Sequence, residues 1–212
     1  MGEAGNVERD DTRARDSERE NESGVPTFDA GTSVLVLASG SAPDAEQSLL
    51  APEEAPDGRG LLVIGVTSDP AETVGRYRER LRAEPGPCAL VRVGPSAGEG
   101  GPPDTTVERV EEPANLTGLG TTVTRVVEDW EPGWRAWFDT LGPLVHHAGP
   151  QNICQFSHLF AGRLAEQGAT AFVRVDPAIH DEQLVHRLMG AFDAAVWDQR
   201  AEPGEDWKVR RR

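Results

Sequence analysis

Short apolar runs recur along the chain from residue 34 onward and alternate with longer amphipathic stretches. The runs are continuously apolar, as expected for strands that are covered on both faces of a sheet. They occupy residues 34–37, 61–64, 89–91, 171–173 and 194–197. Strands that alternate with helices are joined by right-handed crossovers. The pattern therefore predicts an α/β fold, a three-layer domain with a mainly parallel twisted sheet.

The amphipathic stretches carry apolar side chains every three or four residues, the spacing of one helix face. Local signals agree with helices there: Asp69 and Asp181 stand at N-cap positions, and Gly168 follows the third stripe as a C-terminal glycine. The stripes are Val74, Tyr77 and Leu81; residues 116–130; Ile153, Phe156, Phe160 and Leu164; and residues 184–192.

Residues 1–26 differ from the rest of the chain. They mix acidic side chains, arginine, asparagine, serine and glycine with hardly any apolar residue. Such a segment buries too little apolar surface to offset the entropy of ordering its backbone. The sequence thus predicts a disordered acidic leader at 1–26 and one folded domain at 27–212.

The net charge of the chain indicates the salt concentration at which it is expected to fold. Asp and Glu number 36 against 21 Lys and Arg, which gives a net charge of −15. Molar salt screens such self-repulsion, so the composition predicts a halophilic protein. It argues against nucleic-acid binding, because the one obvious basic cluster is residues 210–212, interpreted as a solvated tail with anion binding as the alternative.

The sequence shows no pattern typical of a membrane segment, and its two cysteines form no recognisable motif. No apolar run reaches the roughly 18 residues of a membrane span, and no signal-peptide pattern begins the chain, so we expect a cytoplasmic protein that does not associate with membranes. Cys88 and Cys154 fit no metal-ligand spacing and are expected to be buried thiols.

The first predicted strand leads into a loop that can be aligned with a P-loop, the pattern G-x-x-x-x-G-K-[ST]. Only Gly40 matches: Ala45 stands at the second glycine, Glu46 at the lysine and Gln47 at the hydroxyl position. The chain's one lysine, Lys208, is far away in sequence. A carboxylate at the lysine position would repel a triphosphate.

Several segments together carry a family resemblance. They are residues 115–120 (NLTGLG), 137–144 (WFDTLGPL), 176–181 (DPAIHD) and 190–196 (GAFDAAV). These segments resemble an uncharacterised haloarchaeal family of KaiC-like proteins, a degenerate branch of the RecA-type P-loop fold. The resemblance covers roughly residues 33–198, nearly the whole folded part.

The resemblance assigns Asp139 to the acidic position that lies on the magnesium side in active KaiC-like ATPases. The usual catalytic glutamate just before it is missing, because Trp137 and Phe138 stand there. With lysine, hydroxyl and general base all replaced, three contributions to phosphoryl transfer are lost. The alternative role for Asp139 is the N-cap of the following helix.

Two further groups have alternative interpretations. His180 and Asp181 follow a strand end, where open α/β sheets bind ligands; Asp181 could equally cap a helix while His180 fills a turn. The indoles at 130, 134 and 137 could form a partner-binding patch or belong to the core. The five histidines match no metal motif, so no metal site is expected. They are His146, His147, His158, His180 and His186.

Taken together, these features predict a non-catalytic KaiC/RecA-like pseudo-ATPase that acts as a regulatory or protein-interaction module, with no cofactor and an unidentified protein partner. A vestigial ligand pocket would include Gly40, Asp139, His180 and Asp181. The alternative is a nucleotide-binding sensor or ATPase that binds phosphate through arginine side chains. The oligomeric state stays open, a RecA-type ring being one possibility.

Overall fold

We describe a computed structural model of the chain, which covers residues 25–40, 43–50, 60–80, 86–95, 100–198 and 207–212. The proposed leader therefore lies outside the described residues except for its last two. Of these, Pro26 is buried and Val25 packs against the core. The folded body thus begins by Val25.

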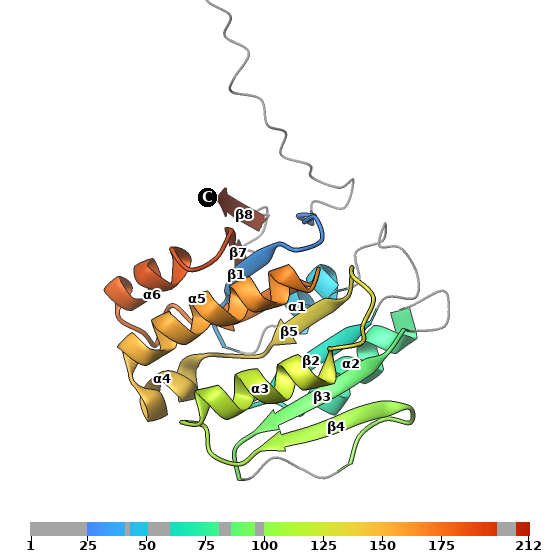
Figure 1. Cartoon of the computed structure of the whole chain (residues 1–212). Helices are drawn as coiled ribbons and strands as arrows, with labels where there is room; N and C mark the ends of the chain where they lie inside the picture. Colours follow the sequence, from blue (N-terminus) through green and yellow to red (C-terminus); the bar gives the residue numbers. More distant parts are fainter. Residues whose placement is uncertain (1–24, 41–42, 51–59, 81–85, 96–99, 199–206) are drawn as a thin grey trace, which may run out of the picture.

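One twisted sheet runs through the described residues in the order β4-β3-β2-β5-β6-β1-β7-β8 (Figure 1). Neighbouring strands are parallel except for β7 and β8, which are antiparallel. The strands are β1 (Ser33–Leu37), β2 (Leu61–Gly65), β3 (Cys88–Val93), β4 (Thr105–Val110), β5 (Arg135–Phe138), β6 (Thr170–Val175), β7 (Ala194–Asp198) and β8 (Trp207–Arg211).

Helices cover both faces of this sheet. One face carries α1 (Pro43–Leu50) and α2 (Pro70–Arg80). The other carries α3 (Leu116–Val126), α4 (Gly142–Ala148), α5 (Pro150–Glu166) and α6 (Glu182–Met189) (Figure 1). The structure confirms the predicted three-layer α/β domain and is consistent with a Rossmann/RecA-like architecture.

The continuous apolar runs are explained by burial on both faces. Along β1, Leu35 and Leu37 point to the α3–α6 layer, while Val34 and Val36 point to the α1–α2 layer. All five residues of β1 and of β2 are buried. Alternate side chains point to opposite faces, so a central strand carries apolar residues at nearly every position.

The predicted helix boundaries are largely confirmed. Asp181 caps α6 by accepting hydrogen bonds from the backbone N–H groups of Gln183 and Leu184, at 2.7 and 3.4 Å. Asp69 precedes α2 and accepts from the N–H of Ala71 at 3.0 Å. Gly168 follows α5 with φ +73°, a left-handed conformation that favours glycine. Leu81 lies outside the described residues.

Two edge strands were not predicted. β4 is largely exposed and its apolar residues are few, so it lacks the signal of a buried strand. β8 includes Arg210 and Arg211, which were expected in a solvated tail. The tail interpretation is therefore wrong in part: these arginines are exposed, but their backbone pairs with Ala194 and Ala195 of β7.

Candidate functional site

The carboxyl ends of β1, β5 and β6 meet at one edge of the sheet. β6 lies between β1 and β5, so Gly40 and Asp139, which follow β1 and β5, are separated by one strand. This edge is where open α/β folds bind ligands. The structure thus brings two of the predicted pocket residues to one edge, on either side of β6.

The carboxylate of Asp139 is buried and holds the loop that follows β2. Its oxygens accept hydrogen bonds from the backbone N–H groups of Val66, Thr67 and Ser68, at 2.9, 2.9 and 2.8 Å. The hydroxyls of Thr67 and Ser68 add two more, at 3.1 and 2.9 Å. Five donors within the protein therefore engage this carboxylate, which is 3% exposed.

Asp139 does not cap the next helix. The N-cap residue of α4 is Leu141, and no side-chain hydrogen bond caps that helix. The N-cap interpretation of Asp139 is thus wrong. The carboxylate points across to the neighbouring strand β2, because the loop after β2 presents three consecutive N–H groups toward it.

Arg174, near the end of β6, bonds to the segments that follow β5 and β1. Its Nε donates to the carbonyl of Asp139 at 2.5 Å, and one terminal nitrogen donates to the carbonyl of Gly40. Burial lowers the pKa of the Arg174 guanidinium, against the opposing effect of three nearby carboxylates. These belong to Asp139, Asp176 and Glu46.

Asp176, directly after β6, also bonds to the loop that follows β1. One of its carboxylate oxygens accepts from the backbone N–H of Gly40 at 2.7 Å, and the other accepts from the N–H of Ala178 at 2.9 Å. Gly40 has φ +63°, a conformation that glycine adopts without strain. The backbone N–H that a phosphate would contact at Gly40 is therefore bonded to a carboxylate.

Glu46, at the P-loop lysine position, lies on α1 with 6% of its surface exposed. One carboxylate oxygen is 2.6 Å from a terminal nitrogen of Arg76 on α2, and the other accepts from the Thr73 hydroxyl at 3.1 Å. Burial raises the pKa of the Glu46 carboxyl, whereas Arg76 and Thr73 lower it and Asp139 raises it further. An internal ion pair thus stands where a P-loop protein would present a cation.

The other two predicted pocket residues lie after β6. Asp181 is occupied as the N-cap of α6, as described above. His180 approaches the backbone of α4, where a Cβ added at Gly142 would lie 3.3 Å from its Nε2 atom. This nitrogen is buried without a hydrogen-bond partner. Neither residue is shown to contact Gly40 or Asp139.

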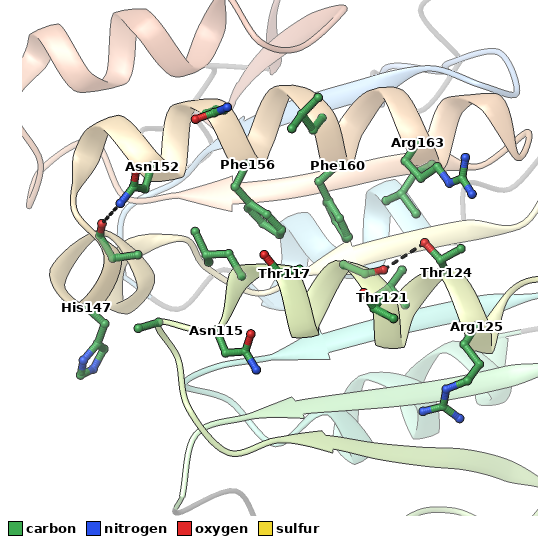
Figure 2. Close-up of a pocket in the computed structure, with 18 of the residues that line it drawn as sticks. Asn115, Thr117, Thr121, Thr124, Arg125, His147, Asn152, Phe156, Phe160 and Arg163 are labelled. Carbon is green, nitrogen blue, oxygen red and sulfur yellow. Dashed lines mark hydrogen bonds between the residues drawn. The ribbon is translucent and has the colours of Figure 1, made fainter.

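A second candidate site is an open groove of about 1190 Å³ between α3 and α5. Figure 2 shows Phe156 and Phe160 pointing from α5 toward α3, where Thr117 and Thr121 face them. The apolar part of the lining also includes Leu116, Val123, Leu159 and Leu164. Helix periodicity assigns Phe156, Phe160 and Leu164 to a core face of α5, and Leu116 and Val123 to one of α3. It does not predict a groove, because periodicity does not reveal the spacing between neighbouring helices.

Most of the chain matches one protein family. A family of unknown function (DUF7504) matches residues 31–197. The chain belongs to this family. No curated protein matches it.

The fold of this DUF7504 domain also occurs in solved structures. One, from Pyrococcus horikoshii OT3 and described only as a structural study, matches with a TM-score of 0.58 at 13% sequence identity. The match covers 87% of this chain and 88% of that one. At such identity the similarity concerns the fold alone.

The tryptophans of the DUF7504 domain are mainly core residues. Trp134 and Trp137 are each 1% exposed, and Trp130 packs edge-on against Trp134 with ring centroids 5.3 Å apart. The core interpretation of this cluster is confirmed. Cys88 is buried and Cys154 half-buried, and both are free thiols.

His146 and His147 pack edge-on with ring centroids 5.4 Å apart. Among the described residues, no group of three or more His, Cys, Asp or Glu side chains could hold a metal ion. Four of the five histidines are exposed and only His180 is half-buried. None of the helices in the described parts of the chain has the length and apolar character to cross a membrane.

Proposed function

We propose that this domain is a non-catalytic RecA-like pseudo-ATPase of KaiC-like descent, which acts as a regulatory or protein-interaction module in a halophilic cytoplasm. The observation that carries the proposal is the ion pair between Glu46 and Arg76. A carboxylate fixed at the P-loop lysine position opposes a triphosphate electrostatically, and its cationic partner is already engaged.

Two other features of the sheet edge support the same proposal. The Asp139 carboxylate accepts five hydrogen bonds from the protein, so few lone pairs are left for a hydrated magnesium ion. The N–H of Gly40 is bonded to Asp176, which puts negative charge where phosphate oxygens would bind. Partners within the protein are therefore found for the Glu46 and Asp139 carboxylates and for the Gly40 N–H.

Support for the protein-interaction part comes from the groove between α3 and α5. A groove with apolar side chains between two helices is a form of site that can bind a segment of another protein. Leu159, on its rim, is 63% exposed. The net charge of −15 supports the halophilic and cytoplasmic part of the proposal, since molar salt would screen the self-repulsion.

The decisive experiment is thermal unfolding of the purified chain in molar KCl, with and without Mg-ATP and Mg-ADP. A ligand present at 100 times its Kd would stabilise the folded state by about 2.7 kcal/mol and raise the melting temperature. We expect no shift at millimolar nucleotide. A clear shift would contradict the proposal.

The alternative of a nucleotide sensor or ATPase has one favourable feature, the Arg174 guanidinium between the ends of β1 and β5. If nucleotide does raise the melting temperature, the Arg174→Met variant separates specific binding from a general salt effect. Loss of the shift in that variant would favour the sensor. Inorganic sulfate at matched ionic strength is the control.

A further inference from the structure

The two walls of the groove differ in shape in a complementary way. On the α5 wall Leu159 protrudes, with 63% of its surface exposed. On the α3 wall Gly120 lines the groove, and a Cβ built there would meet no atom within 4 Å. One wall thus carries a protruding apolar side chain. The other carries a position without a side chain and with open space around it, here called the hollow.

The protrusion and the hollow lie at the same level along the groove. In Figure 2 Phe160 on α5 points toward Thr121 on α3, and the two helices run in the same direction. Leu159 directly precedes Phe160, and Gly120 directly precedes Thr121. A second groove turned to face this one could therefore place its Leu159 over Gly120.

Charge is also arranged in a complementary way. Arg163 on the α5 wall and Glu128, just beyond the end of α3, lie toward the same end of the groove. The lining residues at the opposite end include Asn115 and Asn152 and no Asp, Glu, Lys or Arg. Arg125, the third charged lining residue, is paired with Glu108 of β4 at 3.0 Å. Arg163 lies 3.5 Å from Glu166 on its own helix, and both of these side chains are exposed.

We infer that the groove binds the same groove of a second copy of this chain, about a two-fold axis parallel to α3 and α5. Such an axis places α5 of each copy over α3 of the other. Leu159 then fills the hollow at Gly120 of the partner subunit, and Arg163 faces Glu128 of the partner subunit. An axis across the helices would instead place Arg163 over the end that holds Asn115 and Asn152.

The low charge of this face suits a second copy in particular. The chain has a net charge of −15, so two copies repel each other over most of their surface. The groove lining contains one carboxylate residue, Glu128, against two arginines. The lining therefore adds little to the repulsion between two copies, and isologous contacts of this kind close into dimers.

The choice of glycine at 120 is consistent with an external contact. Glycine inside a helix lowers stability by about 0.5–1 kcal/mol relative to alanine. Nothing within the described residues would obstruct a Cβ at Gly120. In the proposed dimer, the hollow that this glycine leaves is filled by Leu159 of the partner subunit.

This inference rests on the proposed function, because it names a second copy as the protein that the groove binds. The mass of the chain in molar KCl, measured by sedimentation up to about 0.1 mM, tests it directly. We expect twice the monomer mass of 22.9 kDa. A monomer across that range would overturn the inference, whereas only the nucleotide titration overturns the pseudo-ATPase proposal.

Gly120→Ala should change the stability of the fold and the stability of the dimer in opposite directions. It should raise the melting temperature of the fold, because alanine favours the helix, and weaken the dimer at least about tenfold, because the methyl group fills the hollow. Gly162→Ala is the matched control. Gly162 lies on α5 with open space around it and does not line the groove, so this variant should stabilise the fold and leave the dimer unchanged.

Charge reversal tests the direction of the axis. Arg163→Glu and Glu128→Arg should each weaken the dimer, and the double variant should restore it. Leu159→Glu should produce a folded monomer, since the side chain is exposed within one copy. A dimer that tolerates Leu159→Glu and Gly120→Ala would overturn the inference, and failure of the double variant to restore association would overturn the proposed axis.

Discussion

A carboxylate oxygen of Glu46 on α1 lies 2.6 Å from a terminal nitrogen of Arg76 on α2. The pair links the two helices of one layer at the residue that the P-loop alignment assigns to lysine. The Arg76 side chain is 30% exposed and that of Glu46 only 8%. Loss of the arginine therefore leaves a nearly buried negative charge, whereas loss of the glutamate leaves a cation that water can reach.

Arg76→Met should lower the free energy of unfolding by about 2–3 kcal/mol, because it leaves the Glu46 carboxylate without its cation. The double variant Glu46→Gln/Arg76→Met should recover most of this loss, since a neutral amide can still bond to the Thr73 hydroxyl. Denaturant unfolding in molar KCl measures both. Equal losses in the single and double variants would contradict the coupling.

The pH dependence of stability should also reflect Glu46. Its pKa in the folded protein is raised, first by burial, above the ordinary value of 4.5. The folded state thus holds this proton more tightly than the unfolded state. The stability that the protonated group contributes is fully present below pH 4.5 and is lost as pH rises through the raised folded pKa.

Unfolding of the wild type and of Glu46→Gln from pH 4 upward isolates this effect, because the other carboxylates are common to both proteins. We expect the stability of the wild type relative to the variant to fall as pH rises above about 4.5. A difference that is constant across this range would show that Glu46 titrates normally.

Asp139→Ala should destabilise the fold strongly, because it leaves the backbone N–H groups of Val66, Thr67 and Ser68 without their acceptor. We expect a loss of about 3–4 kcal/mol. Asp181→Ala removes a carboxylate that caps one exposed helix and should cost about 1 kcal/mol. Chemical denaturation compares the two variants, and similar losses would argue against a structural role specific to Asp139.

The central strands could be predicted from the sequence because burial on both faces leaves a local signature of consecutive apolar residues. All five residues of β2 are buried, and its run of consecutive apolar residues is visible in the sequence. The edge strands have no such signature. β4 exposes Val107, which is 40% accessible, and β8 is rich in basic residues.

The hydrogen-bond and ion-pair partners of the candidate site residues could not be predicted, because they are distant in sequence. The charge conflict at Glu46 was visible in the P-loop alignment, but its partner Arg76 lies 30 residues away. Asp176 lies 136 residues from Gly40 along the chain. Only the strand order, with β6 between β1 and β5, brings Arg174 and Asp176 to the edge between Gly40 and Asp139.

The two thiols should differ in reactivity. Cys88 is 3% exposed, so it should react with an aromatic disulfide reagent only when the chain unfolds. Burial raises the pKa of the Cys154 thiol, although the Arg187 charge opposes this. Because the thiolate is the nucleophile, Cys154 should react more slowly than a free thiol at pH 8 and accelerate at higher pH.

Single-cysteine variants, Cys88→Ala and Cys154→Ala, assign the two rates, and the protein in denaturant supplies the reference for full reactivity. The Cys88→Ala protein should lose the slow phase that depends on unfolding and keep the phase that depends on pH. Rapid labelling of the Cys154→Ala protein in the native state would contradict the burial of Cys88.

Gly168 occupies a position that other residues should not tolerate. Its φ is +73°, and a Cβ there would lie 2.6 Å from the Cβ of Pro132. Gly168→Ala combines backbone strain with a steric clash and should lower the free energy of unfolding by about 2–3 kcal/mol. Gly162→Ala, six residues earlier on α5 in open space, should raise it by about 0.5–1 kcal/mol. Thermal and denaturant unfolding of the two variants should therefore give changes of opposite sign, and a neutral Gly168→Ala would mean that the α5–β6 turn can shift away from Pro132.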